Sequence, residues 1–592
     1  MRKAQVDRRR FIKASSGAAA VAIISGLPAC GNNDVSPSEF RYGVASGDPL
    51  TDRVILWTHA KIADSTTAVG LTWQVSSDAN FASLVQSGRL MATADTGFTA
   101  KVDATGLSAG SSYFFRFIDD AGVVSPVGQT RTLPKSDVSS VKLAVFSCSL
   151  YSEGFFNAYE AAAKSDAQYA VHLGDYIYEY ASDPAKYGNA DAVKLDRVIA
   201  PANEIVTLDD YRTRYAKYRS DPDLRAVHAK MPFITIWDDH ESANNAWVGG
   251  AENHKATQGD WNTRKANAAK AYHEWMPIRT DASGNLLKIY RRFDFGSLMT
   301  LHMLDTRIEG RDQQYDGFGD ADQGVTRYLT ALATGSDATH RMMSVAQQTW
   351  LVDGIKSSTA SWQVLGNQTI MTRMWFPGNV IQAQNNYFAS PTKANQDAVT
   401  KAIGDFLMAK FTRFAAGPAA LSASQQGLLD TKTNPRIPYN LDAWDGYPLQ
   451  REAIFQSAKS AGKKLVTISG DSHNGWFGNL TTLAGEKIGW EFAGTSVTST
   501  GFESAGLGGL GPQLDGSMFT AQVGNAAIGA GLGLIDDLVY TDTSRRGYLL
   551  LTVSASSVKG EFVFVDTVKS KTYATSVGKT VTVQNNGTVV VA

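Results

Sequence analysis

Polar residues that bind metals or move protons follow an apolar segment near residue 173. The segment ends in His172 and Leu173, and the next five residues are Gly-Asp-Tyr-Ile-Tyr. Gly174 permits a tight turn after a strand. Asp175 offers a carboxylate that can bridge two cations, and Tyr178 can bind the harder cation as a phenolate. Together with the similar residues at other strand ends, described next, these residue types predict a phosphoester hydrolase with two or three metal ions.

Similar residues follow other apolar segments of the chain. They are Cys148, then Asp238, Asp239, His240 and Glu241 with Asn244 and Asn245, then Asp305 with Arg307, then Asn367, and finally Asp471 with His473. A single polar residue after a strand is usually a helix cap or a turn former. The whole set is harder to explain in that way, because ligand sites in α/β proteins lie at the carboxyl ends of strands. We therefore expect these side chains to converge at one edge of one sheet.

The segments that must position these residues have the pattern of an α/β region. Short apolar runs predict strands at residues 141–146, 168–173, 233–237, 299–304, 362–366 and 465–469, with a helix at 154–164. Residues 183–231 and 253–277 predict helical insertions, and 376–425 predict a long excursion over the site. The Gly-rich residues 501–533 predict a loop that can act as a lid. Residues 548–553 and 560–565 predict strands that extend the main sheet.

The region before residue 135 has a different pattern. Segments rich in β-branched and aromatic residues predict strands at 54–58, 71–75, 98–102 and 113–117, and the turn before Tyr113 is similar to one in fibronectin type III-like domains. We therefore predict an N-terminal β-sandwich over residues 36–138 and a catalytic domain over 139–592, preceded by an export segment at 1–35.

The export segment carries a twin-arginine pattern, Asp-Arg-Arg-Arg-Phe-Ile-Lys at residues 7–13, followed by an uncharged run. Residues 27–31 resemble a lipobox with Cys30 as the acceptor, and simple cleavage nearby is the alternative. The sequence thus predicts export by the twin-arginine translocase to the periplasm, the medium or a lipid anchor at the cell surface.

Composition and charge narrow the choice of partners. The chain has 592 residues, of which 43% are hydrophobic and 19% charged, and its formal net charge is -1. This balance gives no electrostatic basis for nucleic-acid binding. The two cysteines are Cys30 and Cys148, so export leaves Cys148 unpaired. A thiolate that binds a metal before export would account for that residue.

Three blocks of the sequence resemble the metallophosphoesterase superfamily. They are residues 174–178, the Trp-Asp-Asp-His-Glu of 237–241 and the Ser-Gly-Asp-Ser-His of 469–473. Residues 41–49 and 444–448 are similar to blocks of the alkaline phosphatase D (PhoD-like) family. The resemblance covers nearly the whole mature chain. It implies an α/β metallophosphoesterase-type sandwich, with mixed sheets flanked by helices, behind an all-β fibronectin type III-like domain.

The chain departs from the superfamily pattern at several ligand positions. Cys148 stands for the first Asp, Asp239 for an Asn, Asn367 for a His and Asp471 for another His. The set of Cys148, Asp175, Tyr178 and His473 favours Fe³⁺. Oxygen donors from Asp175, Asp239, Asn367 and Asp471 suit Ca²⁺, with Mn²⁺ or Mg²⁺ as less favoured ions. The family resemblance implies the same pair of metals, and Asn244 or Asn245 can contribute.

Catalytic roles follow from the blocks and from charge. The resemblance implies that His240 lies beside the leaving group, to which it gives a proton or a hydrogen bond. Asp239, in the same block, is a further candidate for the catalytic set. A structural His240 held by Asp238 is the alternative. Arg307 is a candidate phosphate clamp, because guanidinium binds phosphate in bidentate fashion. A salt bridge to Asp305 is the alternative for Arg307.

These observations predict a hydrolase of small organic phosphomonoesters and phosphodiesters that acts by metal-hydroxide attack on phosphorus. A phospholipase D-type diesterase is an alternative on the same scaffold. A catalytically silent protein that binds a surface through its β-sandwich is a third reading. The sequence carries no signal for the oligomeric state.

Overall fold

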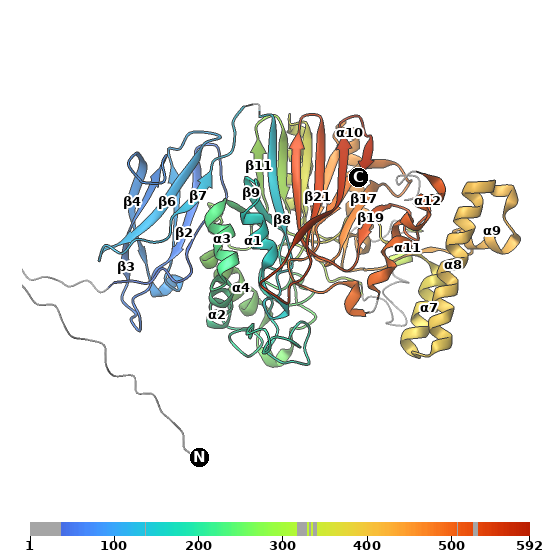
Figure 1. Cartoon of the computed structure of the whole chain (residues 1–592), viewed down its shortest axis with the longest axis horizontal. Coiled ribbons are helices and arrows are strands. Elements are labelled where there is room, and N and C mark those ends of the chain that lie inside the picture. Colours follow the sequence, from blue (N-terminus) through green and yellow to red (C-terminus); the bar gives the residue numbers. More distant parts are fainter. Residues whose placement is uncertain are drawn as a thin grey trace, which may run out of the picture. The chain divides into compact units, whose positions relative to one another are not determined.

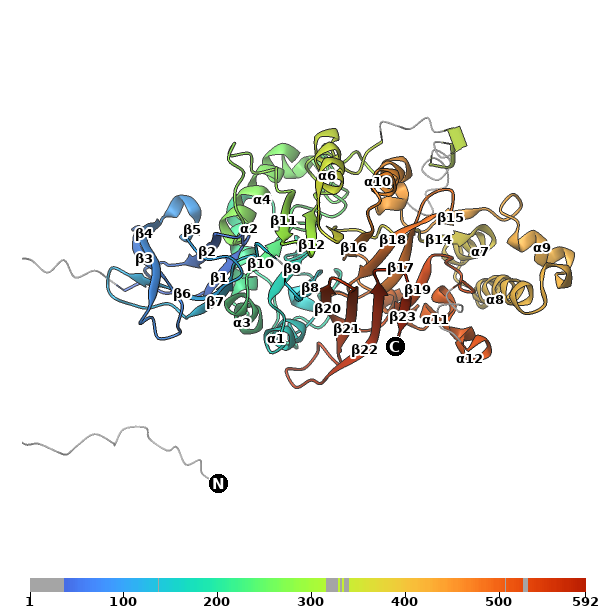
Figure 2. The same ribbon diagram turned by 90° about the horizontal axis from the view of Figure 1, so that it is seen from above.

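The computed structural model describes residues 37–592, apart from 137, 316–327, 331–332, 335–339, 506 and 525–530. The export segment and Cys30 therefore lie outside the described residues. Residues 37–592 form a compact unit. Its centre is a pair of mixed β-sheets that face each other across a shared apolar core, with helices on the outer faces (Figures 1 and 2). No helix among the described residues has the length and apolar character that crossing a bilayer requires.

The first sheet is 10-stranded and has the parallel strands β8 (Ser140–Phe146), β9 (Tyr169–His172) and β10 (Phe233–Thr235) near its middle. Four antiparallel strands extend it on one side, as the sequence predicts for residues 548–553 and 560–565. They are β20 (Arg546–Ser554), β21 (Ser557–Val565), β22 (Thr575–Gln584) and β23 (Val589–Val591).

The second sheet is 7-stranded and contains the remaining predicted strands. Its order is β11 (Arg291–Phe295), β12 (Met299–Met303), β13 (Trp362–Gly366), β16 (Leu465–Ser469), β18 (Lys487–Ala493), β17 (Gly475–Thr481) and β19 (Leu538–Asp542). Strands β12, β13, β16 and β18 are parallel. The expectation of one sheet edge was therefore wrong. The polar residues follow strands of two facing sheets whose carboxyl ends meet.

The N-terminal region is all-β, as predicted. Strands β1 (Val44–Gly47), β2 (Arg53–His59) and β5 (Thr99–Thr105) face a 4-stranded sheet across an apolar core. That sheet has the order β4 (Leu84–Ala92), β3 (Val69–Ser76), β6 (Ser112–Asp119) and β7 (Gly128–Arg131). The hydroxyl of Tyr113 accepts a hydrogen bond from the Ser108 N–H at 2.8 Å, which closes the turn that the sequence singled out.

The β-sandwich is continuous with the first sheet, because β1 pairs in parallel with β10 at Gly47 and Phe233. A Cβ atom at Gly47 would lie 2.6 Å from the Phe233 carbonyl oxygen, so this approach requires glycine. The next residue, Asp48, is buried and forms a salt bridge with Arg291 at 2.7 Å. The block at residues 41–49 thus fastens the sandwich to the catalytic region.

Helices cover both outer faces of the sheet pair. Helices α1 (Asn157–Ala163) and α3 (Pro222–Lys230) lie on the first sheet, and α6 (Val345–Ser357) and α10 (Pro448–Ser460) lie on the second (Figure 2). Helices α2 (Leu208–Arg219) and α3 occupy the second half of the predicted helical insertion at 183–231, and α4 (Trp261–Trp275) occupies most of the one at 253–277. Residues 183–207 form turns and loops, so the prediction of helix was wrong there.

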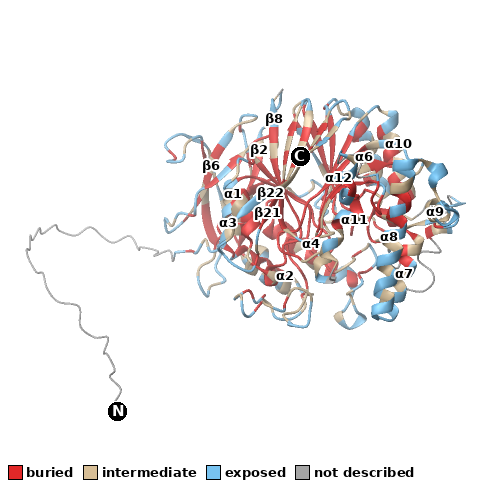
Figure 3. Ribbon diagram, turned by 45° about the vertical axis from the view of Figure 1, so that its right-hand side comes forward, coloured by how far each residue is buried: buried red, intermediate tan, exposed pale blue. Residues whose placement is uncertain are grey.

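Residues 376–425 form α7 (Gly378–Ala389), α8 (Lys393–Ala416) and the start of α9 (Ala423–Leu429), flanked by the strand pair β14 (Trp375–Pro377) and β15 (Arg436–Pro438). Much of α7–α9 is exposed (Figure 3). The Gly-rich residues are not a plain loop, since they include α11 (Gly511–Asp515) and α12 (Thr520–Val523). The two regions pack together, and Phe411 stacks on Phe519 with ring centres 4.9 Å apart.

Candidate metal centre

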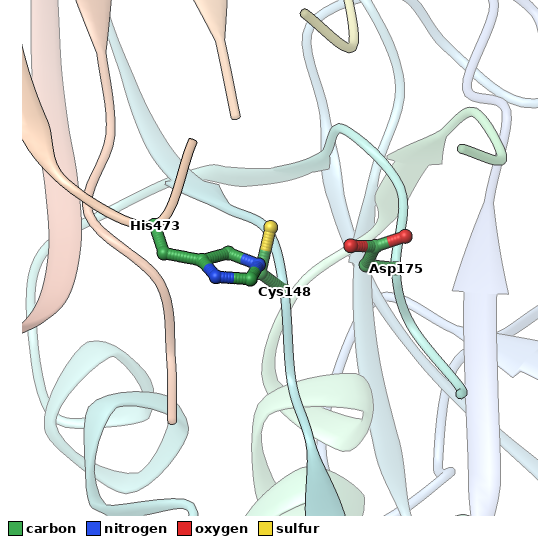
Figure 4. A group of neighbouring side chains, drawn as sticks. All are labelled: Cys148, Asp175 and His473. Carbon is green, nitrogen blue, oxygen red and sulfur yellow. The ribbon is translucent and has the colours of Figure 1, made fainter. Parts of the chain in front are cut away.

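Three predicted ligands from different strand ends meet at one point. The ligand atoms of Cys148, Asp175 and His473 lie within 4.8 Å of one another (Figure 4). Cys148 follows β8, Asp175 follows β9 and His473 follows β16. Their φ angles are 59°, 55° and 61°, in the left-handed region that residues other than glycine rarely adopt. Such strain persists where the surrounding structure imposes it, and it clusters at functional sites.

A backbone carbonyl sets the orientation of the His473 ring. The Nδ1 atom lies 2.8 Å from the Thr500 carbonyl oxygen, so Nδ1–H donates to that oxygen and Nε2 is left as the free ligand atom. Nε2 lies 3.3 Å from the Tyr178 hydroxyl. Burial lowers the pKa of His473 to about 3, which keeps the imidazole neutral and able to coordinate a metal.

Tyr178 joins the same group. Its hydroxyl donates to Oδ2 of Asp175 at 3.0 Å and lies 2.7 Å from the Ser499 hydroxyl. Burial, assisted by the charge of Asp175, raises the pKa of Tyr178 and of the Cys148 thiol well above their usual values. A phenolate and a thiolate would therefore form here only with a cation nearby.

The buried carboxylates have unused acceptor capacity. Among the described residues, no hydrogen-bond partner reaches Oδ1 of Asp175 or Oδ2 of Asp238. A buried charged oxygen without a partner costs free energy unless a cation or hydrogen-bond donor compensates it. Sulfur, phenol, imidazole and carboxylate donors around unpartnered oxygens thus fit a metal centre.

Two further groups of donors continue from the first. Asp175, Asp239 and His240 form one group, and Asp238, Asp239 and Asp471 form another, each with ligand atoms within 4.8 Å. Asp175 belongs to the first two groups and Asp239 to the last two. The donors therefore form one continuous series from Cys148 to Asp471, which is long enough for more than one cation.

Backbone donors and nearby charges hold Asp239 as a carboxylate. It accepts hydrogen bonds from the N–H groups of His240 at 3.0 Å and Asn245 at 2.6 Å. Burial alone would raise the pKa of Asp239. The charges of Arg307 and His240 outweigh burial and hold this pKa well below its usual value. An ionised carboxylate at this position is suited to calcium.

The two predicted amide ligands have protein partners in this structure. The side-chain oxygen of Asn367 accepts a hydrogen bond from the Trp444 indole at 2.9 Å. Asn244 lies at the edge of the site, where its amide nitrogen donates to Glu252 at 3.2 Å and its backbone N–H donates to Glu179 at 2.8 Å. Their role as metal ligands therefore stays a prediction.

The guanidinium of Arg307 is fully buried among carboxylates. It donates to Asp442 at 2.7 Å and to Asp471 at 2.9 Å, and its Nε–H donates to Asp238. Asp239 lies 3.8 Å away. Sequence reasoning missed Asp442, which precedes the block at 444–448 by two residues and follows no predicted strand.

Asp305, the alternative partner predicted for the Arg307 side chain, binds backbone and indole N–H groups instead. Asp305 accepts hydrogen bonds from the Arg307 backbone N–H at 2.8 Å and from the Trp237 indole at 2.9 Å. It thus holds the turn after β12, and the guanidinium of Arg307 is directed to other carboxylates.

The partner of His240 is Glu179, which sequence reasoning also missed. Nδ1 of His240 lies 2.6 Å from Oε2 of Glu179, and the ring lies against Tyr178 with centres 4.3 Å apart. Burial alone would lower the pKa of His240, but Tyr180 and the carboxylates of Glu179 and Asp239 raise it well above its usual value. The only signal in the sequence is that an acidic residue directly follows Tyr178.

Glu241 ties two of the ligand loops together. Its carboxylate accepts hydrogen bonds from the backbone N–H groups of Asp175 at 3.0 Å, Tyr176 at 2.6 Å and Asp238 at 2.8 Å. Gly174 permits this approach, because a Cβ atom there would lie 2.3 Å from the Asp238 Cβ. The loops after β9 and β10 are thus fixed relative to each other by protein hydrogen bonds.

Comparison with known proteins gives a consistent result. Residues 143–562 match the model of the PhoD-like phosphatase family, and residues 26–134 match its N-terminal domain. Alkaline phosphatase D of Bacillus subtilis (strain 168) is 31% identical over 521 residues, which cover 84% of this chain and 76% of that protein. A solved structure described as the structure of PhoD superposes with a TM-score of 0.71 at 28% identity, covering 94% of this chain and 93% of the other.

Proposed function

Because the chain belongs to the PhoD-like phosphatase family and is thus a hydrolase of the alkaline phosphatase D type, we propose that it hydrolyses small organic phosphomonoesters and phosphodiesters at the metal centre. The observation that carries this proposal is the continuous series of donors from Cys148 to Asp471. Phosphoester hydrolysis needs neutralisation of phosphate charge and a strong oxygen nucleophile, and adjacent cations supply both.

The donor types suggest which metals the series holds. Cys148, Asp175, Tyr178 and His473 would hold a ferric ion, and Asp239 and Asp471 would hold calcium with manganese or magnesium as less favoured ions. When bound, these cations supply Lewis acidity, which lowers the pKa of a coordinated water and neutralises phosphate charge. Asn367 and Asn244 would complete the second site.

The residues around the donors position the reacting groups. Asp175 belongs to two neighbouring donor groups, so its carboxylate would serve as a ligand in both. His240, held by Glu179, donates a proton or a hydrogen bond to the leaving oxygen. Arg307 acts in this proposal by fixing the carboxylates of Asp471 and Asp442, because its guanidinium already donates to both.

Export is a further part of the proposal. The twin-arginine pattern at residues 7–13 supports passage by the translocase as a folded protein, to the periplasm, the medium or a lipid anchor at Cys30. Cys148 is a buried free thiol, which a metal bound before export would protect from oxidation. Calcium is available after export, so the two sites can fill in different compartments.

Substrate assays on the purified full-length protein test the proposal. We expect hydrolysis of 4-nitrophenyl phosphate and bis-4-nitrophenyl phosphate at rates well above that of phosphatidylcholine. Asp175→Ala should abolish all of these activities, since it removes the shared ligand. A preference for phosphatidylcholine would favour the phospholipase reading. Full activity after Cys148→Ala, Asp175→Ala and His473→Ala, each made singly, would contradict the proposed site. Absence of activity from the metal-loaded wild type on all three esters would favour the surface-binding reading.

A further inference from the structure

A cavity of about 190 Å³ adjoins the metal centre on the side of Asp471. Most of its wall is apolar. The main wall residues are Ile370, Met374, Tyr439, Ala443, Trp476 and Phe502. All of them except Ala443 belong to, or pack against, an apolar cluster separate from the core between the sheets. Nothing in the proposed chemistry at the donors uses this cavity.

Aromatic side chains give the cavity a defined shape. Phe502 packs edge-on against Tyr439 and Trp476, with ring centres 5.5 Å and 5.7 Å apart. The Trp476 indole N–H donates to the Ser472 hydroxyl at 2.7 Å, so the polar atom of that ring is satisfied. Such a wall favours another ring, because aromatic pairs prefer offset or edge-to-face contacts.

The acidic groups at the cavity are largely compensated within the protein. Asp445 forms a salt bridge with Arg451 at 2.9 Å and accepts the Met374 N–H at 2.8 Å. Asp471 accepts a hydrogen bond from Arg307 at 2.9 Å. Asn440 also lines the cavity, and its side-chain oxygen accepts the Asp442 N–H at 2.8 Å. The interior is thus suited to an uncharged, mainly apolar ligand group.

The cavity and the donor series share a residue. Asp471 is a member of the third donor group and also lines the cavity. Phe502 is positioned by the same loops as the metal ligand His473, because the Phe502 N–H donates to Asn474 at 3.2 Å and Thr500 accepts from His473. A group bonded to a phosphate at the donors can therefore extend directly into the cavity.

We propose that this cavity binds the organic part of the substrate, and that the preferred esters carry a single aromatic ring or an apolar group of similar size. The proposal rests on the phosphoesterase function proposed above. A dry cavity of about 150 Å³ with aliphatic and aromatic walls binds benzene in another protein. A volume of 190 Å³ therefore holds one ring with a small substituent, and it is too small for the two acyl chains of a phospholipid.

The test compares esters whose leaving groups are similar in chemistry but different in shape. Benzyl phosphate and glycerol 1-phosphate are both esters of primary alcohols, so a difference between them reports binding of the organic group more than leaving-group reactivity. For the metal-loaded full-length enzyme we expect kcat/KM for benzyl phosphate to exceed that for glycerol 1-phosphate by about tenfold or more. Hexadecyl phosphate, whose chain exceeds the cavity, should be a poorer substrate than benzyl phosphate.

Two variants change the cavity in opposite directions. Phe502→Ala removes an aromatic wall, and Ile370→Phe fills space. Each should lower kcat/KM for benzyl phosphate by about tenfold, mainly through KM, and should lower that for glycerol 1-phosphate much less. The matched control is Phe519→Ala, which removes a ring from the same apolar cluster without touching the cavity wall, and it should leave the ratio of the two substrates unchanged.

Inhibition by benzyl alcohol measures binding without turnover, and its inhibition constant should rise in Phe502→Ala. If both substrates are hydrolysed but their ratio is the same in wild type, Phe502→Ala and Ile370→Phe, the cavity proposal is wrong while the phosphoesterase function stands. A preference for hexadecyl phosphate over benzyl phosphate would also overturn the proposal. If the metal-loaded enzyme hydrolyses no phosphate ester, the proposed function itself fails.

Discussion

Nδ1 of His240 lies 2.6 Å from Oε2 of the buried Glu179. The contact leaves Nε2 as the ring nitrogen that can face a substrate. Glu179 also accepts the Asn244 backbone N–H at 2.8 Å, so its carboxylate is itself held in place. Glu179 is therefore a positioning residue for the proton donor.

Glu179→Gln should lower kcat by about 100-fold for benzyl phosphate, because an ill-positioned His240 protonates a poor leaving group less well. The loss should be much smaller for 4-nitrophenyl phosphate, whose leaving group needs little protonation, and KM should change little for either. Steady-state kinetics of the metal-loaded variant with both substrates measures this. Equal losses for the two substrates would show that Glu179 acts only in folding of the site.

Asp442→Asn should destabilise the fold by about 3 kcal/mol, since it removes a charge that faces two buried guanidinium groups. Asp442 accepts from Arg307 at 2.7 Å and from Arg311 at 2.5 Å. Urea unfolding followed by fluorescence measures the free energy. The control is Asp397→Asn on α8, where an exposed pair with Lys393 should change stability by about 0.5 kcal/mol or less. Similar effects in the two variants would refute the role given to Asp442.

Gly174→Ala should disrupt the metal centre. The φ angle of Gly174 is 106°, and a Cβ atom there would lie 2.3 Å from the Asp238 Cβ, so the loops after β9 and β10 must separate. We expect loss of bound metal and of activity. Gly462→Ala is the matched control, because its φ is +65° but no atom lies within 4 Å of the added Cβ. It should cost only about 1–2 kcal/mol of stability and no activity. Metal analysis of both variants distinguishes crowding from backbone strain.

His302 should make part of the stability depend on pH. Burial lowers its pKa to about 4, whereas the unfolded chain takes up the proton near its ordinary value. His302 therefore costs nothing above pH 6.5, and it destabilises the fold progressively as pH falls from about 6.5 to 4. Between pH 6.5 and 4 the free energy of unfolding of His302→Gln should fall less steeply with decreasing pH than that of wild type. The two slopes should differ by up to about 1.4 kcal/mol per pH unit. Identical slopes in urea unfolding of the metal-free proteins would contradict the shift.

Much of the fold could be predicted from local pattern. Buried strands such as β8, β9 and β16 are short apolar runs, and the polar residues that follow them stand out in the sequence. The division of these strands between two sheets could not be predicted. A strand that is apolar on both faces carries no local pattern that indicates which other strand it pairs with. Strand β4 was missed for another reason. It is mostly exposed, and its apolar residues stand in adjacent groups, Leu84-Val85 and Leu90-Met91, instead of alternating with polar ones.

Some residues of the candidate site could be predicted from the sequence and others could not. Cys148, Asp175 and His473 follow strands and could be selected by residue type, and the structure brings them together. Glu179 and Asp442 act by holding other residues, and their partners are 61 and 135 positions away in the chain. Long-range pairing of this kind leaves no local pattern, so it appears only when the tertiary structure is known.

The central claim is that Cys148, Asp175, Tyr178 and His473 hold a common ferric ion. The most direct test is elemental analysis of freshly purified protein together with its visible spectrum, for wild type and His473→Ala. We expect iron in proportion to wild-type protein and a visible absorption band from Tyr178 bound to iron, with both lost in the variant. A colourless wild-type enzyme that contains no iron and is fully active would contradict the claim.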